Sequence, residues 1–262
     1  MVSAEVAALT QQHKKLTWQR ISIVVGLCLI AAVAFVVSNF VGAIDISPGE
    51  VIRGIVNPSS LDDQTHTVLW KLRLPMAVMA LLIGVSLSLA GAEMQTILNN
   101  PLAEPFTLGI SAAAAFGGAS SIVLKWQLLA QPQFNLALVA WLSAAVATAI
   151  IVVAAIIRGA KAETMVLLGI GLVFFFQAML ALIQYQSSAE ALQQIVFWSM
   201  GSLTRANWVA NGVLAGVLLV ALPILWALSW RLTALRLGDA RAAAMGINTA
   251  RLRVVVLIVV SL

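Results

Sequence analysis

Residues 71–111 read KLRLPMAVMALLIGVSLSLAGAEMQTILNNPLAEPFTLGIS, in which a long apolar run lies between polar segments. Its apolar run, 74–98, is long enough to cross the hydrocarbon core of a bilayer, which takes about 20 helical residues. A basic pair, Lys71 and Arg73, precedes the run, and a tight polar link, 99–105, follows it. A second apolar run begins directly after the link. The stretch therefore predicts a membrane hairpin whose basic pair and polar link lie on opposite membrane faces.

The composition is that of an integral membrane protein. Of the 262 residues, 61% are hydrophobic and only 10% are charged, with a mean hydropathy of +1.01. A soluble domain carries about 25% charged residues. The apolar runs are continuous, which excludes a transmembrane barrel, whose strands alternate over about ten residues. We therefore predict an all-α integral membrane protein, a polytopic helical bundle. The net charge is +5, but the basic residues lie at the ends of apolar runs, so the charge does not indicate nucleic-acid binding.

Six complete spans and the start of a seventh are expected from the apolar runs. They cover 21–44, 74–98, 106–124, 135–157, 164–186 and 208–229, and the seventh begins at 252. The chain divides accordingly into an N-terminal segment, 1–20, and a transmembrane domain, 21–262. Only nine residues follow Arg253, far fewer than a span needs, so we expect a C-terminal part of this domain to be missing.

The basic residues predict the orientation in the membrane. The connections expected on one side hold ten of them: Lys14, Lys15, Arg20, Arg158, Lys161, Arg231, Arg236, Arg241, Arg251 and Arg253. The opposite side holds five: Arg53, Lys71, Arg73, Lys125 and Arg205. Because cytoplasmic connections are enriched in Lys and Arg, we expect a multi-pass protein whose N-terminal segment is cytoplasmic.

Two helices are expected outside the membrane. Residues 187–190, Ser-Ser-Ala-Glu, match a capping box before apolar residues at helical spacing, which predicts an external helix at about 188–200 that ends at a glycine. The longest cytoplasmic connection, 230–251, contains a short helical segment with Asp239 as its expected N-cap and Gly246 as its expected left-handed stop. The pattern alone leaves open whether this segment binds a partner or lies at the lipid headgroups.

No catalytic constellation is found in the sequence. It has no phosphate-binding Gly-x-x-x-x-Gly-Lys-Ser/Thr loop and no set of nucleophile and base. Its two histidines, His13 and His66, are far apart, and its single cysteine, Cys28, lies inside an apolar run. We therefore expect no catalytic, metal-binding or cofactor-binding residue in this chain.

Glu93 is the one acidic residue within the predicted spans. An ionisable group inside a span is a functional candidate by default. Its closeness to Asn99, however, also permits simple snorkelling to the interface or a hydrogen bond to a neighbouring helix. If the spans enclose a transport pathway, Glu93, Gln95, Asn100 and Pro101 are the candidates for its lining or its inner gate.

Several motifs stand in the order seen in one family. They are Arg73-Leu-Pro75, Ala90-Gly91 followed by Met94-Gln95, Asn100-Pro-Leu-Ala-Glu-Pro105, Leu108-Gly-Ile-Ser111, Trp198-x-x-Gly201-Ser-Leu203, and Leu237-Gly-Asp239 with Met245-Gly-Ile247. Over about residues 70–262, the sequence resembles the FecCD/BtuC-like family, the membrane permeases of bacterial ABC importers for iron–siderophore complexes, haem or vitamin B12. The resemblance implies the fold of a type II ABC importer permease, with ten helices in the family and about six and a half here.

The resemblance also implies an assembly in the bacterial cytoplasmic (inner) membrane. A second permease subunit, identical or related, would complete the pathway, two cytoplasmic ATPase subunits would bind ATP and Mg²⁺, and a soluble binding protein would deliver the cargo. This chain would bind no cofactor and would act by alternating access. An iron–siderophore chelate is the expected cargo, with haem and cobalamin as alternatives. An ion-coupled secondary transporter, the alternative from a different class, would lead us to expect paired intramembrane charges, and Glu93 has no such partner.

The resemblance assigns roles to residues in two regions. The positions that match the family's coupling helix, which sits in a cleft of the ATPase, are Gly238, Asp239, Arg241, Met245 and Gly246. Arg73 matches an arginine that meets the binding protein on the outer face. The family often has a second arginine where this sequence has Met76, and we expect Lys71 to substitute for it.

Overall fold

The structure is a computed structural model that describes residues 2–42 and 44–262, with side chains except at 2–10, 13, 133 and 158. Residue 1 of the expected N-terminal segment and residue 43 of the first expected span lie outside the described residues. Every regular element in the described ranges is a helix, as the sequence predicts. The chain forms two compact units, Met1–Leu81 with Thr204–Asn211, and Leu82–Leu203 with Gly212–Leu262.

The first unit begins with one long helix, α1 (Val2–Phe40). Its apolar part, long enough to cross a membrane, is Lys14–Phe40. Residues 2–20 belong to the same helix as the first span, and their place as a separate N-terminal segment stays a prediction. The helix also ends earlier than the expected residue 44, just before Gly42, a residue type that disfavours helix.

A short helix, α2 (Pro48–Val56), follows α1 and begins with a capping box. The Ser47 hydroxyl accepts a hydrogen bond from the N–H of Glu50 at 3.3 Å, and the Glu50 carboxylate accepts one from the N–H of Ser47 at 2.8 Å. Trp70 is joined to this helix, because its indole N–H donates to the Gly54 carbonyl at 2.9 Å. These bonds fix the fold of the turn region between the first two spans.

The second span is longer than the sequence predicts. A 3-10 turn (Pro58–Ser60), α3 (Asp63–His66), a π-helical stretch (Thr67–Arg73) and α4 (Leu74–Ile97) follow one another. From Asp63 onward they form one apolar helix of 35 residues. Pro75 does not break it, because the N–H of Leu74 bonds to the carbonyl of Leu69, five residues back. This wider turn accommodates the proline ring.

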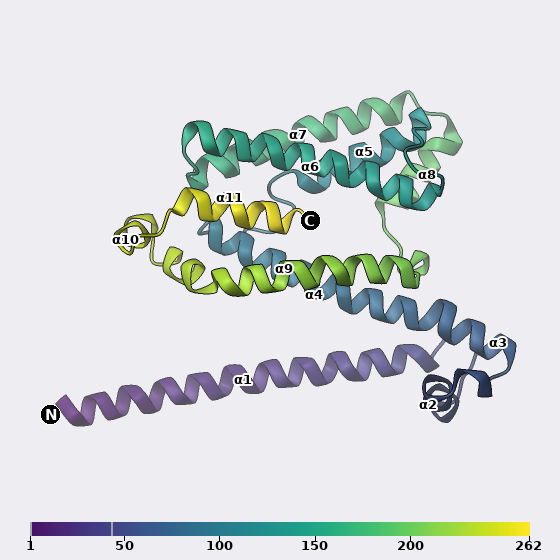
Figure 1. Cartoon of the computed structure of the whole chain (residues 1–262), viewed down its shortest axis with the longest axis horizontal. Helices are drawn as coiled ribbons and strands as arrows, with labels where there is room; N and C mark the ends of the chain where they lie inside the picture. The colour runs from purple at the N-terminus through teal and green to yellow at the C-terminus, as the bar shows by residue number, and fades with distance from the viewer. Residues whose placement is uncertain (1, 43) are drawn as a thin grey trace. The chain divides into compact units, whose positions relative to one another are not determined.

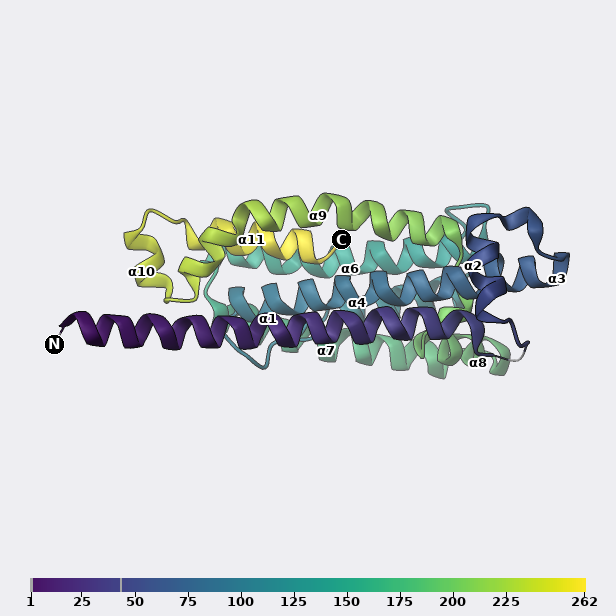
Figure 2. The same ribbon diagram turned by 90° about the horizontal axis from the view of Figure 1, so that it is seen from below.

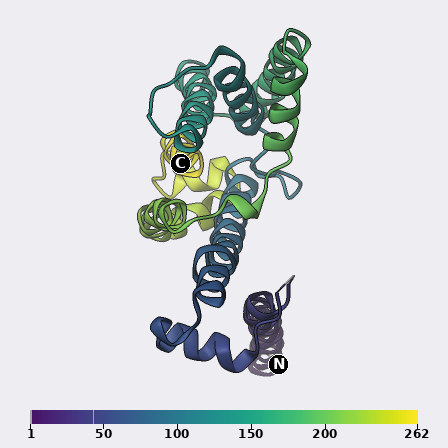
Figure 3. The same ribbon diagram turned by 90° about the vertical axis from the view of Figure 1, so that its right-hand side faces the viewer.

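The second unit contains the last part of α4 and most of the remaining helices. These are α5 (Ile110–Leu124), α6 (Pro132–Arg158), α7 (Ala162–Tyr185), α8 (Ala189–Ser199), α9 (Trp208–Leu235), α10 (Asp239–Ala244) and α11 (Thr249–Val260). α5 packs against α6, α7 and α8, and α11 packs against α6 and α10 (Figures 1 and 3).

Five of the described helices are long and apolar enough to cross a membrane, against the six complete spans that we predict. The sixth, α5, has 15 residues and begins at Ile110 rather than 106. The apolar residues before it form a turn in which the N–H of Gly109 bonds to the carbonyl of Phe106 at 3.2 Å. Gly109 has a φ of 75°, which ends any helical continuation toward the N-terminus.

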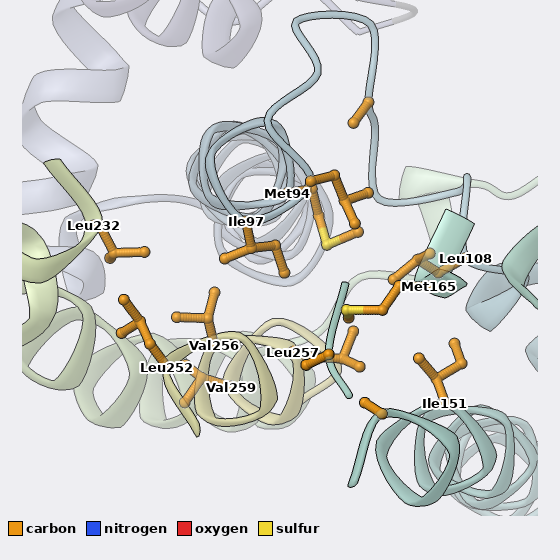
Figure 4. Close-up of a cluster of buried hydrophobic side chains, with 14 of the residues drawn as sticks. Met94, Ile97, Leu108, Ile151, Met165, Leu232, Leu252, Val256, Leu257 and Val259 are labelled. Atoms are coloured by element: carbon orange, nitrogen blue, oxygen red, sulfur yellow. The ribbon is translucent and has the colours of Figure 1, made fainter. Parts of the chain in front are cut away.

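The apolar core of the second unit lies where α4, α6, α7 and α11 meet (Figure 4). Met94 and Ile97 from α4, Ile151 from α6, Met165 from α7 and Leu257 from α11 are almost completely buried there. α11 runs alongside α6 over this core (Figure 2). In a membrane, such contacts stabilise through close van der Waals packing rather than through exclusion of water.

The external helix predicted at 188–200 is present as α8. Its N-cap is Ser188, whose hydroxyl accepts from the N–H of Ala191 at 3.3 Å. The predicted N-cap, Ser187, is wrong by one position, because Ser188 caps the helix, and the Glu190 carboxylate is hydrogen-bonded to Ser188. Gly201 follows the helix with a φ of 70°, as predicted.

Two adjacent glycines give α5 its closest contacts. A Cβ on Gly118 would lie 2.3 Å from the ring of Trp198, so α8 lies directly on α5. A Cβ on Gly117 would lie 2.6 Å from the Cβ of Ser143 and 2.8 Å from the carbonyl oxygen of Val139, both on α6. Small residues at these positions therefore allow the close helix approach that stabilises helix packing in lipid.

Gly117→Ala is expected to lower the stability of the chain by about 1–3 kcal/mol, because the added methyl would overlap α6. Thermal unfolding of the purified protein in detergent, followed by tryptophan fluorescence, measures the effect. Gly216→Ala is the matched control, because nothing lies within 4 Å of a Cβ built on that glycine. Equal melting temperatures for the two variants would contradict the close α5–α6 contact.

Candidate functional site

The polar link that follows α4 is a compact turn. Asn99 has a φ of 46°, the left-handed conformation that commonly ends a helix. The N–H of Asn99 bonds to the carbonyl of Thr96 at 3.3 Å, and the N–H of Asn100 bonds to the carbonyl of Gln95 at 3.1 Å. This is a Schellman closure in which an asparagine takes the usual place of glycine.

Three of the predicted gate candidates meet in this turn. The side-chain amide of Gln95 donates to the carbonyl of Pro101 at 3.0 Å, and the side-chain oxygen of Asn100 accepts from the N–H of Leu102 at 2.9 Å. Pro101 has no N–H, so the carbonyl of Ile97, four residues earlier, receives no helical hydrogen bond. These residues hold the link in shape, and their part in a gate stays a prediction.

The fourth gate candidate, Glu93, makes none of the hydrogen bonds within this turn. It is half-buried on α4, one turn before the end of the helix. Arg236, just beyond α9, is the cation that interacts with it electrostatically. This arrangement fits a side chain that extends toward the membrane–water interface. A role of Glu93 in the gate stays a prediction.

The far end of the link packs against α7. A Cβ on Gly169 would lie 2.8 Å from the Cα of Leu108. A Cβ on Gly109 would lie 2.9 Å from the backbone nitrogen of Val173. The Leu-Gly-Ile-Ser motif therefore marks a backbone-to-backbone contact between the link and α7 that larger residues would prevent.

The expected coupling loop, 230–251, is mostly helical. α9 continues to Leu235, so only a short connection remains before α10. The N-cap of α10 is Gly238, with a φ of 99°, and Asp239 is the first helical residue. The prediction of Asp239 as N-cap is wrong, because its carboxylate bonds to another helix instead. Gly246 ends the segment with a φ of 78°, as predicted.

α10 presents most of its surface outward. Ala242 is fully buried and holds the helix to the unit. The N–H of Ile247 bonds to the carbonyl of Ala242 at 3.1 Å, which closes the C-terminal turn. Arg241, Met245 and Leu237 are exposed. The predicted coupling residues Arg241 and Met245 thus lie on a small projecting element, beside the exposed Leu237.

Arg253 connects these parts, although we expected it only as a charge that sets topology. Its side chain is 2% exposed. Its Nε donates to the carbonyl of Ile97 at 2.7 Å, and its Nη1 donates to the carbonyl of Ala160 at 2.8 Å. Both Nη atoms also donate to the carboxylate of Asp239, at 2.8 and 2.7 Å. One guanidinium therefore joins the end of α4, the α6–α7 connection and the start of α10.

The Asp239 carboxylate is charged at neutral pH. Hydrogen bonds from Arg253, aided by its positive charge, hold the pKa of Asp239 below its ordinary value of 3.8, against a smaller opposing effect of burial. A depressed pKa in the folded state means that the pair stabilises the fold above about pH 4. That contribution is lost as the pH falls through the folded-state pKa, so the pair persists at neutral pH.

An open cavity of about 1060 Å³ lies beside this junction. Asn99 and Asn100 line it from the link, Lys161 and Glu163 from the start of α7, and Asp239 from α10. Three connections that we predicted on one membrane side, 99–105, 158–163 and 230–253, therefore do meet at one end of the unit.

The structure separates the two predicted docking residues in the first unit. Lys71 is exposed, whereas Arg73 is only 7% exposed. The guanidinium of Arg73 donates to the carbonyl of Asn39 at 3.0 Å and to that of Ile44. Gly42 leaves room for it, since a Cβ there would lie 2.6 Å from Nη2. Arg73 bonds the end of α1, so only Lys71 of the pair offers its charge to a partner.

Among the described residues, no group of three or more His, Cys, Asp or Glu side chains could hold a metal ion. Cys28 is exposed on α1. The side chain of His13 lies outside those described, so the expectation about it is untested.

The comparisons with known proteins agree with this geometry. The FecCD transport family matches residues 28–262. The chain belongs to this family. An ABC transporter permease protein of Methanocaldococcus jannaschii is 31% identical over 260 residues, which cover 96% of this chain and 74% of that protein. A vitamin B12 import system permease of Vibrio cholerae is 33% identical over 251 residues, with 92% and 69% covered.

Another relative of this FecCD chain is an iron chelatin transport system permease of Helicobacter pylori, 35% identical over 196 residues. The match covers 74% of this chain and 57% of that protein. A solved structure described as an inward-facing metal-chelate type ABC transporter has a TM-score of 0.77 at 30% identity, with 92% of this chain and 72% of that chain covered. The predicted fold, an all-α membrane bundle of the ABC importer permease kind, is confirmed.

Arg73→Gln is expected to destabilise the chain by roughly 2 kcal/mol, because two carbonyl groups near the end of α1 lose a charged donor. Lys71→Gln, at an exposed position on the same helix, should change the melting temperature little. Thermal unfolding of both variants in detergent checks this. Equal stability of Arg73→Gln and the wild type would refute the anchoring role of Arg73.

Proposed function

We propose that this FecCD-family chain is one permease half of an ATP-driven importer that carries an iron–siderophore chelate across the bacterial inner membrane. The observation that supports it most is the family match over residues 28–262, together with the projecting helix α10. The family assignment also favours an ATP-driven importer over an ion-coupled secondary transporter. A second permease subunit would face this one across the pathway.

The exposed side chains of α10 suit a partner's cleft. Arg241 can pair with an acidic group of an ATPase subunit, and Met245 is a flexible apolar side chain that adapts to a groove. Gly238 and Gly246 allow the tight turns on either side, since both have positive φ. Closure of two ATPase subunits on ATP and Mg²⁺ would then displace α10 and switch the pathway between outward-facing and inward-facing forms.

On the opposite side of the membrane, a soluble binding protein would deliver the cargo. Of the predicted docking pair, Lys71 is available as a cation at the surface. Arg73 contributes by holding the chain that precedes it against α1. The larger number of basic residues in the connections around α10 supports a cytoplasmic location of that helix and of the N-terminus.

The cargo has a second candidate. The iron chelatin permease of Helicobacter pylori and the vitamin B12 permease of Vibrio cholerae are 35% and 33% identical to this chain. Cobalamin is therefore the alternative to an iron–siderophore chelate that a specific relative supports. Both cargos arrive already chelated, so the pathway needs no metal ligands of its own.

Uptake into proteoliposomes is expected to require ATP hydrolysis. The complete transporter would be reconstituted with its ATPase subunits, with and without the catalytic glutamate of the ATPase, and offered a radiolabelled iron–siderophore chelate or radiolabelled cobalamin. We expect saturable uptake of the iron chelate only with the active ATPase. Uptake that is unchanged with the inactive ATPase would overturn the importer proposal, and uptake of cobalamin alone would replace the cargo.

The double variant Arg241→Glu/Gly246→Trp tests the coupling helix. It reverses the exposed charge of α10 and blocks its left-handed turn, so uptake per ATP hydrolysed should fall about tenfold. Arg231→Glu is the control, because Arg231 is exposed on α9 outside the proposed coupling residues. Normal coupled transport by the double variant would remove the role assigned to α10.

A further inference from the structure

We propose that the contacts of Arg253 transmit a displacement of α10 to the end of α4 and to the α6–α7 connection. Arg253 is a positioning residue for coupling and touches neither cargo nor nucleotide. The inference rests on the proposed function of α10 and assigns the path by which a displacement of that helix reaches the membrane spans.

The first reason is local to the end of α4. A helix leaves its last carbonyl groups without N–H partners. Here the chain turns away from the helix at Asn99, and Pro101 has no N–H, so no later amide bonds the carbonyl of Ile97. The Schellman closure at Asn99 uses the carbonyls of Gln95 and Thr96 and leaves that of Ile97 free. The Nε of Arg253 donates a hydrogen bond to the carbonyl of Ile97 at 2.7 Å, so the link motif and Arg253 form one structural unit.

The second reason is the connection between α6 and α7. It is short and turns at Gly159, which has a φ of 79°. The N–H of Lys161 already bonds to the carbonyl of Gly159 at 2.9 Å. The carbonyl of Ala160 points elsewhere and accepts from Nη1 of Arg253 at 2.8 Å. Displacement of Arg253 therefore pulls on the start of α7 as well as on the end of α4.

The third reason is the pairing with α10. Asp239 is the first residue of that helix, and its two carboxylate oxygens take parallel bonds from Arg253. Such a two-point pair fixes direction as well as distance, which a single point charge does not. The Asp239 side chain is 52% exposed, whereas that of Arg253 is 2% exposed. The pair thus connects a surface element to a buried junction.

The burial of Arg253 makes this junction move as one body. A buried guanidinium must keep its hydrogen-bond partners, because leaving it unpaired costs far more than an exposed ion pair gains. When α10 is displaced, keeping these bonds therefore carries Ile97, Ala160 and Asp239 together. The core contacts of α11, with Val256 and Leu257 fully buried, resist rotation of Arg253 alone.

The experiment compares three single variants in the complete reconstituted transporter. Arg253→Lys keeps the charge but loses the two-point geometry, and Asp239→Asn keeps the shape but loses the charge. Arg251→Lys is the matched control, because Arg251 is exposed two residues earlier on the same helix. ATP hydrolysis and uptake are measured in the same vesicles, with whichever radiolabelled probe the wild type takes up, iron–siderophore or cobalamin.

We expect uptake per ATP to fall about tenfold in Arg253→Lys and Asp239→Asn, and to stay at the wild-type value in Arg251→Lys. Uptake per ATP in the combined variant Arg253→Lys/Asp239→Asn should be no lower than in either single variant, because both changes break the same ion pair. An unchanged ratio of uptake to hydrolysis in both single variants would overturn the inference, including the case in which both rates fall in parallel.

Two further outcomes are also decisive. If Arg253→Lys does not assemble with its partners, the test rests on Asp239→Asn, which leaves the buried arginine in place. The ratio of uptake to ATP hydrolysis in that variant then decides. If the wild type shows no ATP-dependent uptake, the proposed function fails and the inference fails with it. If the wild type transports and both variants keep its ratio, only the role of Arg253 is lost.

Discussion

A helix that ends within a membrane protein leaves carbonyl groups without N–H partners, and lipid offers no donor to replace them. In each compact unit of this protein, a buried arginine supplies that donor. Arg73 bonds the carbonyls of Asn39 and Ile44 at the end of α1. Arg253 bonds those of Ile97 and Ala160. A planar guanidinium with five N–H groups serves several carbonyls at once, which a lysine does not.

The two arginines differ in their remaining partners, and this difference separates structure from function. Within the described residues, the hydrogen bonds of Arg73 go to backbone carbonyls, so it stabilises a junction. Arg253 also pairs with Asp239, an acid on a projecting helix. A contact that joins a surface helix to a buried junction transmits displacement, because the pair fixes both distance and direction. The FecCD family match gives that displacement its proposed cause, an ATPase subunit.

The sequence predicted the long helices well because their signal is local. Continuous apolar runs mark α6 and α7 within a few residues, and they locate α1, α4 and α9, although these helices extend beyond the predicted spans. The helix ends were predicted less well. The start of α5 was placed at 106, because Phe106 is apolar although the residues up to Gly109 form a turn. Asp239 fits the N-cap preference, yet its carboxylate gains more from Arg253 than from the helix amides.

The membrane class, most of the spans and the family can be recognised in the sequence, because they follow from runs of hydrophobicity and from short motifs. Which basic residues are buried, and which groups they bond, depends on contacts that form only in the folded chain. Arg253 lies 156 positions from Ile97 and 93 from Ala160 in the chain. No local pattern records such partners. The link that contains Asn100 and Pro101 is complete only when folding brings Arg253 to the carbonyl of Ile97, which the end of the helix leaves unpaired.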